Sequence, residues 1–157
     1  MHIQITQASP EMADECADAL ADSGIEAHYF SDRDYSVRLI KTGIDNNELF
    51  VAAVDNKAIA GFYWATAKGM FCRFAYLRLL AVKPHYRNLH IGKELLAHFE
   101  RNGFIAAPRV FCTVSAFNTD AQRFYTKNGY TEVSKLVDLY KRGIDELLMM
   151  KTMPQTI

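Results

Sequence analysis

The sequence predicts an α/β (α+β) fold with a mixed central sheet of about seven strands flanked by helices. Strand-like and helix-like patterns alternate through the middle of the chain, and seven short apolar or alternating runs read as strands. The 157 residues, half of them hydrophobic, suffice for one buried core. Because no repeat or Pro/Gly/Ser-rich linker divides the chain, residues 1–157 are predicted to form a single domain.

The N-terminal segment predicts a strand followed by a helix. Residues 2–7 alternate in polarity, as in a half-buried strand. Ser9 can cap a helix that has Pro10 at its first position and Glu11 in its first turn. Gly24 is the expected end of this helix.

An irregular polar segment, residues 25–48, comes next and predicts only a short helix near residues 35–41. Irregular segments of this kind often carry specificity. Residues 49–54 and 58–67 then predict two strands of a hairpin, because the polar residues 55–57 between them suit a tight turn.

The centre of the chain predicts a buried strand, a helix and another strand. Residues 75–82 are nearly all apolar, so we expect a central strand buried on both faces that ends before Pro84. Apolar residues at helical spacing begin at Ile91, and Gly103 is expected to end this helix. Residues 110–114 predict the next strand.

The C-terminal third predicts a helix and two strands. Thr119–Gln122 has the form of a capping box, and the helix that it opens should stop at Gly129. Residues 130–137 and 146–151 read as the last strands. The apolar run Leu147–Met150 fits either a core strand or a homodimer contact.

Composition and charge exclude several functions. Lys plus Arg equals Asp plus Glu at 18 each, which argues against nucleic-acid binding through bulk charge. Cys16, Cys72 and Cys112 lack metal-ligand spacing, so we expect mostly buried, reduced thiols and no metal site. We find no secretory leader pattern and no run of about 18 apolar residues, and therefore expect a cytoplasmic protein without a membrane partner.

The segment 79–93 carries the clearest chemical signal. A buried strand ends at Pro84, a basic loop containing Arg87 follows, and a helix begins near Gly92 and Lys93. A helix N-terminus offers unpaired N–H groups and partial positive charge, which suit a diphosphate. The same pattern also fits an ordinary strand–turn–helix connection with solvated basic residues.

Two motifs in this chain resemble the GNAT acetyltransferase family. The family's acyl-CoA loop reads Arg/Gln-x-x-Gly-x-Gly/Ala, and Arg87–Gly92 occupies these six places. His90 stands where the first glycine is expected, and histidine tolerates positive φ better than most residues do. Downstream, Asn118 and Ala121–Tyr130 match every position of the family pattern Asn, then Ala-x-x-Phe/Leu-Tyr-x-x-x-Gly-Phe/Tyr.

This resemblance implies an N-acetyltransferase that uses acetyl-CoA and attacks it directly with an amine. The backbone N–H of Leu80 would stabilise the oxyanion, and Tyr125 would protonate the departing thiolate. Asn118 would bond cofactor or backbone, although a turn or helix-cap role fits it equally well. The residues implied in cofactor binding are Leu80, Ala81, Val82, Arg87, Asn88, Leu89, His90, Ile91, Gly92, Lys93, Asn118 and Tyr125.

The general base and the acceptor are the least determined features. Some relatives place a Glu where this chain has Tyr76, whose ordinary pKa of about 10 makes it a poor base. A water chain ending on Tyr76, Glu48 or a histidine is an alternative, and His28 is the most suggestive histidine. We expect His28 and Tyr76 near a small-molecule or peptide amine.

The sequence also fits two other functional classes. A non-catalytic acyl-CoA sensor or partner-binding module would explain the missing base and the substitution at His90. A nucleotide-binding protein would use the loop for phosphates, but the chain has no Gly-x-x-x-x-Gly-Lys-Ser/Thr sequence.

Overall fold

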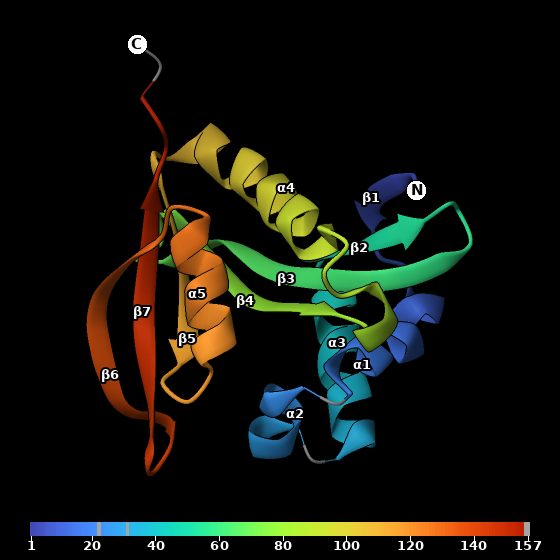
Figure 1. Cartoon of the computed structure of the whole chain (residues 1–157), viewed down its shortest axis with the longest axis horizontal. Coiled ribbons are helices and arrows are strands. Elements are labelled where there is room, and N and C mark those ends of the chain that lie inside the picture. The colour runs from blue at the N-terminus through green and yellow to red at the C-terminus, as the bar shows by residue number, and fades with distance from the viewer. Residues whose placement is uncertain (22, 31, 156–157) are drawn as a thin grey trace. The chain divides into compact units, whose positions relative to one another are not determined.

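The computed structural model describes residues 1–21, 23–30 and 32–155. Its strands form a seven-stranded sheet in the order β1-β2-β3-β4-β5-β7-β6, with helices between them in the chain (Figure 1). The sheet is mixed, because β4 and β5 pair in parallel whereas β1 with β2, β2 with β3, β5 with β7 and β6 with β7 pair antiparallel. The predicted fold class is therefore confirmed.

Two compact units make up the chain. The first contains Met1–Ala65 and Leu79–Phe99, and the second contains Thr66–Arg78 and Glu100–Ile157. Strands β3 and β4 and helix α4 contribute residues to both units.

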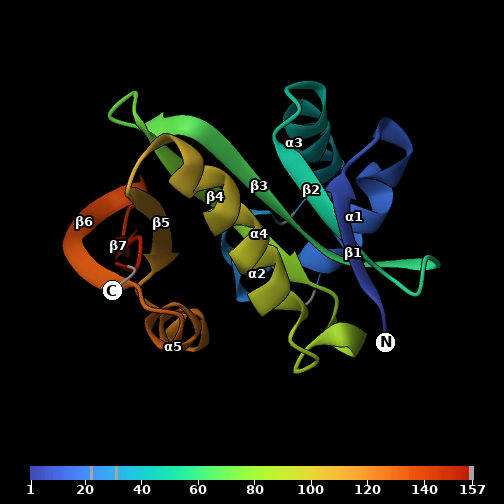
Figure 2. The same cartoon turned by 90° about the horizontal axis from the view of Figure 1, so that it is seen from above.

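The first unit contains an antiparallel arrangement that begins at the N-terminus. Strand β1 (Ile3–Gln7) pairs with β2 (Leu49–Val54), which pairs with β3 (Ala58–Met70) (Figure 2). The predicted hairpin is confirmed, and its turn places Asp55 and Asn56 at φ values of 50° and 56°. Both residue types tolerate this left-handed backbone, which suits a tight hairpin turn.

The helices of the first unit differ from the prediction in their bounds. Pro10–Met12 form a 3₁₀ turn, η1, that leads into α1 (Ala13–Leu20). The predicted end at Gly24 is wrong, because α1 stops at Leu20 and Gly24 is the first residue of α2 (Gly24–Tyr29). The hydroxyl of Ser9 donates to the carboxylate of Glu11 at 2.5 Å and caps no backbone N–H.

Helix α3 (Arg33–Asp45) is much longer than the short helix predicted near residues 35–41. It begins at Asp32, whose carboxylate accepts a hydrogen bond from the backbone N–H of Asp34 at 2.9 Å. Ile40 and Ile44 lie in the core that α3 shares with α1. Tertiary burial thus extends a helix that the polar sequence only weakly supports.

Strand β4 (Phe74–Val82) is central in the sheet, as predicted, but it is not buried on both faces. Ala75, Leu77 and Ala81 are buried, whereas Arg78 is exposed. One face of this strand is therefore partly exposed to solvent, whereas the nearly continuous apolar sequence of residues 75–82 predicted burial on both faces.

The second unit contains the C-terminal strands. β5 (Arg109–Ser115) lies beside β7 (Ile144–Thr152), which also pairs with β6 (Thr131–Lys141) (Figure 1). Leu147 and Met149 are buried on β7, so the core-strand interpretation of the C-terminal apolar run is correct for these two residues.

The three thiols include two buried residues, Cys16 and Cys112, and one exposed residue, Cys72. None forms a disulfide. Among the helices of the described residues, none combines the length and apolar character needed to span a membrane.

Helix α4 (Ile91–Ala106) continues past Gly103, so the prediction that this glycine ends the helix is wrong. A Cβ at Gly103 would lie 2.6 Å from Cγ1 of Val110 and 3.1 Å from Cβ of Ala75. Gly103 is therefore present because β4 and β5 approach the helix closely at this point, within the second unit.

We expect Gly103→Ala to lower the free energy of unfolding. Alanine improves helix propensity by about 1 kcal/mol, but forcing a methyl group against stiff, β-branched Val110 costs about 1–3 kcal/mol. Urea unfolding at constant m-value measures the difference. In the double variant Gly103→Ala/Val110→Ala the two changes should couple favourably. A more stable Gly103→Ala single variant would show that the contact is easily relieved.

Candidate active site

The junction between β4 and α4 is organised by backbone hydrogen bonds within the first unit. The N–H of Lys83 donates to the carbonyl of Ala60 at 2.7 Å, which keeps β4 aligned up to its end. The 3₁₀ turn η2 (Pro84–Tyr86) then reverses the chain. Arg87 follows, and its Nε donates back to the carbonyl of Val82 at 3.1 Å.

The loop that follows has a left-handed backbone at two positions. Asn88 and His90 both have φ of 62°. His90 thus adopts the conformation for which glycine is favoured, so the substitution in the motif leaves this turn intact. The first backbone hydrogen bond of α4 runs from the N–H of Glu94 to the carbonyl of His90 at 3.1 Å.

The start of α4 has the features of an anion site. The N–H groups of Ile91, Gly92 and Lys93 precede the first helical hydrogen bond, so the helix itself leaves them without an acceptor. Residues 87–90 and Lys93 are exposed. Free N–H groups, the positive helix end and two cationic side chains, those of Arg87 and Lys93, favour a phosphate group.

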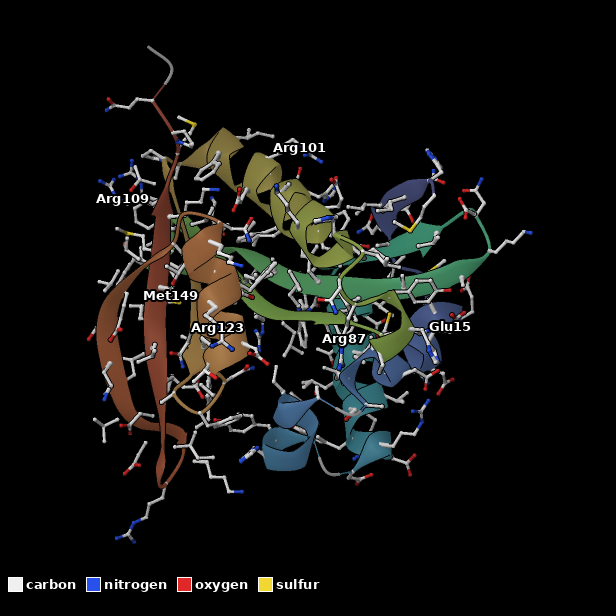
Figure 3. All side chains as sticks on the ribbon, viewed as in Figure 1. Glu15, Arg87, Arg101, Arg109, Arg123 and Met149 are labelled. Carbon is white, nitrogen blue, oxygen red and sulfur yellow. The ribbon has the colours of Figure 1, made fainter. Side chains whose placement is uncertain are left out.

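The basic side chains around β4's end are held in different ways. Lys83 makes an ion pair with Glu15 on α1 at 3.0 Å. Arg87 lies on the loop before α4 and keeps an exposed guanidinium although its Nε bonds to Val82 (Figure 3).

Leu80 and Val82 are half-buried, and Ala81 is buried.

Close approach of β3 and β4 shapes the backbone of this strand in the first unit. A Cβ at Gly61 would lie 2.5 Å from the carbonyl oxygen of Ala81 and 3.1 Å from Cα of Val82. Glycine at this position therefore allows a contact that any side chain would disrupt.

In the second unit, α5 (Thr119–Lys127) is capped by Asn118, not by Thr119 as predicted. The side-chain oxygen of Asn118 accepts a hydrogen bond from the N–H of Ala121 at 3.1 Å. The predicted capping box is wrong in register, because the side chain of Gln122 donates instead to the carbonyls of Ser115 and Ala116. Asn118 thus has at least the helix-cap role.

The C-terminal end of α5 agrees with the prediction. Asn128 is the C-cap, and Gly129 follows with φ of 91°, a conformation that glycine adopts without strain. The carbonyl of Tyr125 accepts the N–H groups of Asn128 and Tyr130, both at 3.0 Å.

Tyr125 is buried on α5, with 8% of its surface exposed. Its ring packs edge-on against Phe124 and Tyr130, with centroid distances of 5.2 and 5.4 Å. Burial raises the pKa of Tyr125 well above its ordinary value, and Cys112 and Tyr76 add to the shift. The phenol is therefore protonated at neutral pH and can act as a proton donor.

Tyr76 on β4 also has its hydroxyl in a hydrogen-bonded cluster. It bonds to the hydroxyl of Thr113 on β5 at 2.8 Å and to the hydroxyl of Tyr140 on β6 at 3.1 Å. Burial raises the pKa of Tyr76 above its ordinary value. Tyr76 is therefore an even poorer base near pH 7 than an exposed tyrosine.

Comparison with known proteins decides the family. Residues 45–132 match the model of the acetyltransferase (GNAT) domain. An uncharacterized N-acetyltransferase of Methanocaldococcus jannaschii is 31% identical over 110 residues, which cover 69% of this chain and 68% of that protein. The chain belongs to the GNAT acetyltransferase family.

Solved structures of GNAT proteins share the fold. A Desulfovibrio desulfuricans protein described as a GNAT-family acetyltransferase has a TM-score of 0.80, 18% identity, and coverage of 96% of this chain and 99% of its own. A GNAT-family acetyltransferase of Bacillus cereus has a TM-score of 0.77, 19% identity, and coverage of 99% and 100%.

The other candidate residues of this GNAT protein lie in different surroundings. His28 lies exposed on α2 in the first unit, with its ring 6.5 Å from that of Tyr29. Glu48 is half-buried and accepts a hydrogen bond from the indole N–H of Trp64 at 2.8 Å. This bond holds the carboxylate of Glu48 against Trp64. No cluster of three or more His, Cys, Asp or Glu side chains suited to a metal occurs in the described part of the chain.

A buried carboxylate near the start of α5 was missed by the sequence reasoning. Glu146 on β7 is 3% exposed and accepts a hydrogen bond from the hydroxyl of Ser115 at 2.7 Å. Because Gln122 bonds to the carbonyl of Ser115, this pair anchors the helix that carries Tyr125. The sequence signal that could have identified Glu146 is a charged residue at the start of an apolar strand.

A largely buried ion pair lies beside Tyr130, which packs on Tyr125. Lys151 and Glu100 form an ion pair at 2.8 Å, and both side chains are largely buried. The ammonium group of Lys151 lies 5.9 Å from the ring centroid of Tyr130, which packs on Tyr125. Burial raises the pKa of Tyr130 above its ordinary value, with Glu100 as a further cause.

The cap at Asn118 is testable by its stability effect. We expect Asn118→Ala to lower the free energy of unfolding by about 1 kcal/mol, because the N–H of Ala121 loses its acceptor. Asn118→Asp keeps an oxygen acceptor at a helix N-terminus and should remain close to wild type. Equal losses in both variants, measured by urea unfolding, would contradict the cap and point to the amide N–H₂ group.

Proposed function

We propose that this protein transfers the acetyl group of acetyl-CoA to a primary amine, which attacks directly within a ternary complex. The observation that carries the proposal is the exposed loop with left-handed Asn88 and His90, which leads into the free N–H groups of α4. This arrangement suits a diphosphate, and family membership makes acetyl-CoA the expected source of one.

Cofactor binding would rely mainly on backbone. The N–H groups of residues 91–93 would bind the diphosphate, with Arg87 and Lys93 supplying positive charge. The backbone of Leu80–Val82 would bond the pantetheine arm. In support, β4 pairs with β5 over Ala75–Leu77 and Val110–Cys112, and β4 continues to Val82. Leu80–Val82 therefore lie beyond the residues of this ladder.

Catalysis would need two hydrogen-bond donors. The N–H of Leu80 would stabilise the developing negative charge on the acetyl oxygen. Tyr125 would donate its phenolic proton to the departing sulfur, for which its high pKa keeps it protonated. The acceptor would be a small-molecule or peptide amine, and the cytoplasm, where thiols stay reduced, is the compartment that we propose.

A second candidate is a non-catalytic acyl-CoA sensor on the same fold. The phenol of Tyr76, hydrogen-bonded to Thr113 and a weak base, favours it. Thiol release from acetyl-CoA separates the two, with a polyamine, an aminoglycoside, free lysine and a peptide with a free amino terminus as acceptors. Amine-dependent release supports the enzyme. Submillimolar acetyl-CoA binding without release from any acceptor supports the sensor.

The loop assignment predicts that Gly92→Glu weakens acetyl-CoA binding by about 10–100-fold, the scale of one lost charge-assisted hydrogen bond. Added bulk and negative charge would both oppose the diphosphate. Isothermal titration of acetyl-CoA measures the effect, and Gly92→Ala is the matched control with a smaller, neutral side chain. An unchanged affinity in Gly92→Glu would remove the diphosphate from this loop.

Removal of the proposed acid should separate binding from turnover. We expect Tyr125→Phe to keep acetyl-CoA affinity and to lower kcat by about 10–1000-fold, the scale of a lost proton donor. Because burial raises the pKa of Tyr125, wild-type kcat should not fall from its ionisation as the pH rises to 10. Steady-state rates across pH check both statements, and an unaltered kcat in Tyr125→Phe would exclude the residue from the reaction.

A further inference from the structure

The hydroxyl groups of three strands form a continuous chain within the second unit. Thr113 on β5, Tyr76 on β4 and Tyr140 on β6 lie at oxygen–oxygen distances of 2.8 Å and 3.1 Å. Exposure increases along the chain, because Thr113 and Tyr76 are half-buried whereas Tyr140 is 60% exposed. The chain of hydroxyls thus runs from a half-buried position to the solvent.

We propose that these three hydroxyls are a proton relay that carries the proton of the attacking amine from Thr113 through Tyr76 to Tyr140 and into water. The inference rests on the proposed function, since it concerns the proton that amine attack releases. In this proposal Thr113 is a catalytic residue that would contact the amine and accept its proton. Tyr76 and Tyr140 would pass that proton on to water.

The chemistry of hydroxyls suits a relay better than a base. A hydroxyl donates one hydrogen bond and accepts others at the same time, so it can take up one proton while it releases another. Burial raises the pKa of Tyr76, which opposes a free phenolate but does not prevent concerted transfer. Among the described residues that hydrogen-bond to the hydroxyl of Tyr76, none is a carboxylate.

The position of the chain relative to the proposed acid supports the same inference. Tyr76 is one of the groups that raise the pKa of Tyr125, so the two phenols are near enough to interact electrostatically. The proposed proton donor and the proposed proton exit both belong to the second unit.

The transfer balances without any further reactant. The nitrogen lone pair of the amine forms the bond to the acetyl carbon, and the carbon–sulfur bond breaks with its electron pair on sulfur. One N–H proton passes to Thr113, whose own proton passes to Tyr76, while Tyr76 protonates Tyr140 and Tyr140 protonates water. Tyr125 protonates the sulfur and regains a proton from solvent, which replaces the one that Tyr140 releases to water, so Tyr125 and each relay hydroxyl end the cycle neutral.

The test removes single oxygen atoms. We expect Tyr76→Phe and Thr113→Val to lower kcat by about 10–100-fold, the scale of assisted proton transfer. Acetyl-CoA affinity should stay within twofold of wild type. Thr113→Ser keeps the hydroxyl and should retain most activity, and Tyr35→Phe, an exposed tyrosine of the first unit, is the control for loss of a phenol.

A solvent isotope experiment distinguishes a relay from a structural role. With the acceptor of highest kcat/KM from the amine panel, wild-type kcat plotted against the deuterium fraction of the solvent should curve, since several protons move together. Tyr140→Phe, altered at the exposed end, should lower kcat and reduce this curvature, because one proton fewer moves. A merely structural role would leave the curvature unchanged.

The outcomes separate the relay from the function on which it rests. If wild type turns over amines but Tyr76→Phe and Tyr140→Phe keep kcat and curvature, the relay is wrong and the acetyltransferase stands. If wild type releases no thiol with any amine, the proposed function fails and the relay fails with it. If Tyr76→Phe does not fold, Tyr140→Phe carries the test alone, and an unchanged kcat there overturns the relay.

Discussion

The free N–H groups at the start of α4 are the feature on which the proposed chemistry depends. The chain turns through two left-handed residues, Asn88 and His90, directly before the helix begins. An asparagine and a histidine can hold this backbone, whereas a β-branched residue would strain it. Since the backbone provides the donors, the side chains of the loop can vary without loss of the site.

The second unit provides a different environment, in which hydroxyls are surrounded by apolar and aromatic groups. Burial raises the pKa values of Tyr76, Tyr125 and Tyr130 and keeps all three phenols protonated at neutral pH. Low polarity strengthens hydrogen bonds among such groups and makes unpaired charge costly. A site of this kind favours proton donation and concerted transfer over a single ionised base.

The sequence predicted much of the candidate site because its signals are local. The turn at His90 and the helix stop at Gly129 are confirmed. Where the prediction failed, contacts outside the motif itself decided the outcome. Gly103 is in mid-helix because Val110 leaves no space for a side chain, and Asn118 took the cap position while Gln122 bonds backwards to the end of β5.

The sequence by itself determined the order of elements along the chain and the loop and tyrosine that carry the family resemblance, because each depends on residues a few positions apart. Only the tertiary structure decided that Thr113, Tyr76 and Tyr140 share one hydrogen-bonded chain and that Glu146 anchors α5 through Ser115. These contacts join different strands of the sheet. Their formation depends on strand order and register, which long-range packing sets and local pattern does not encode.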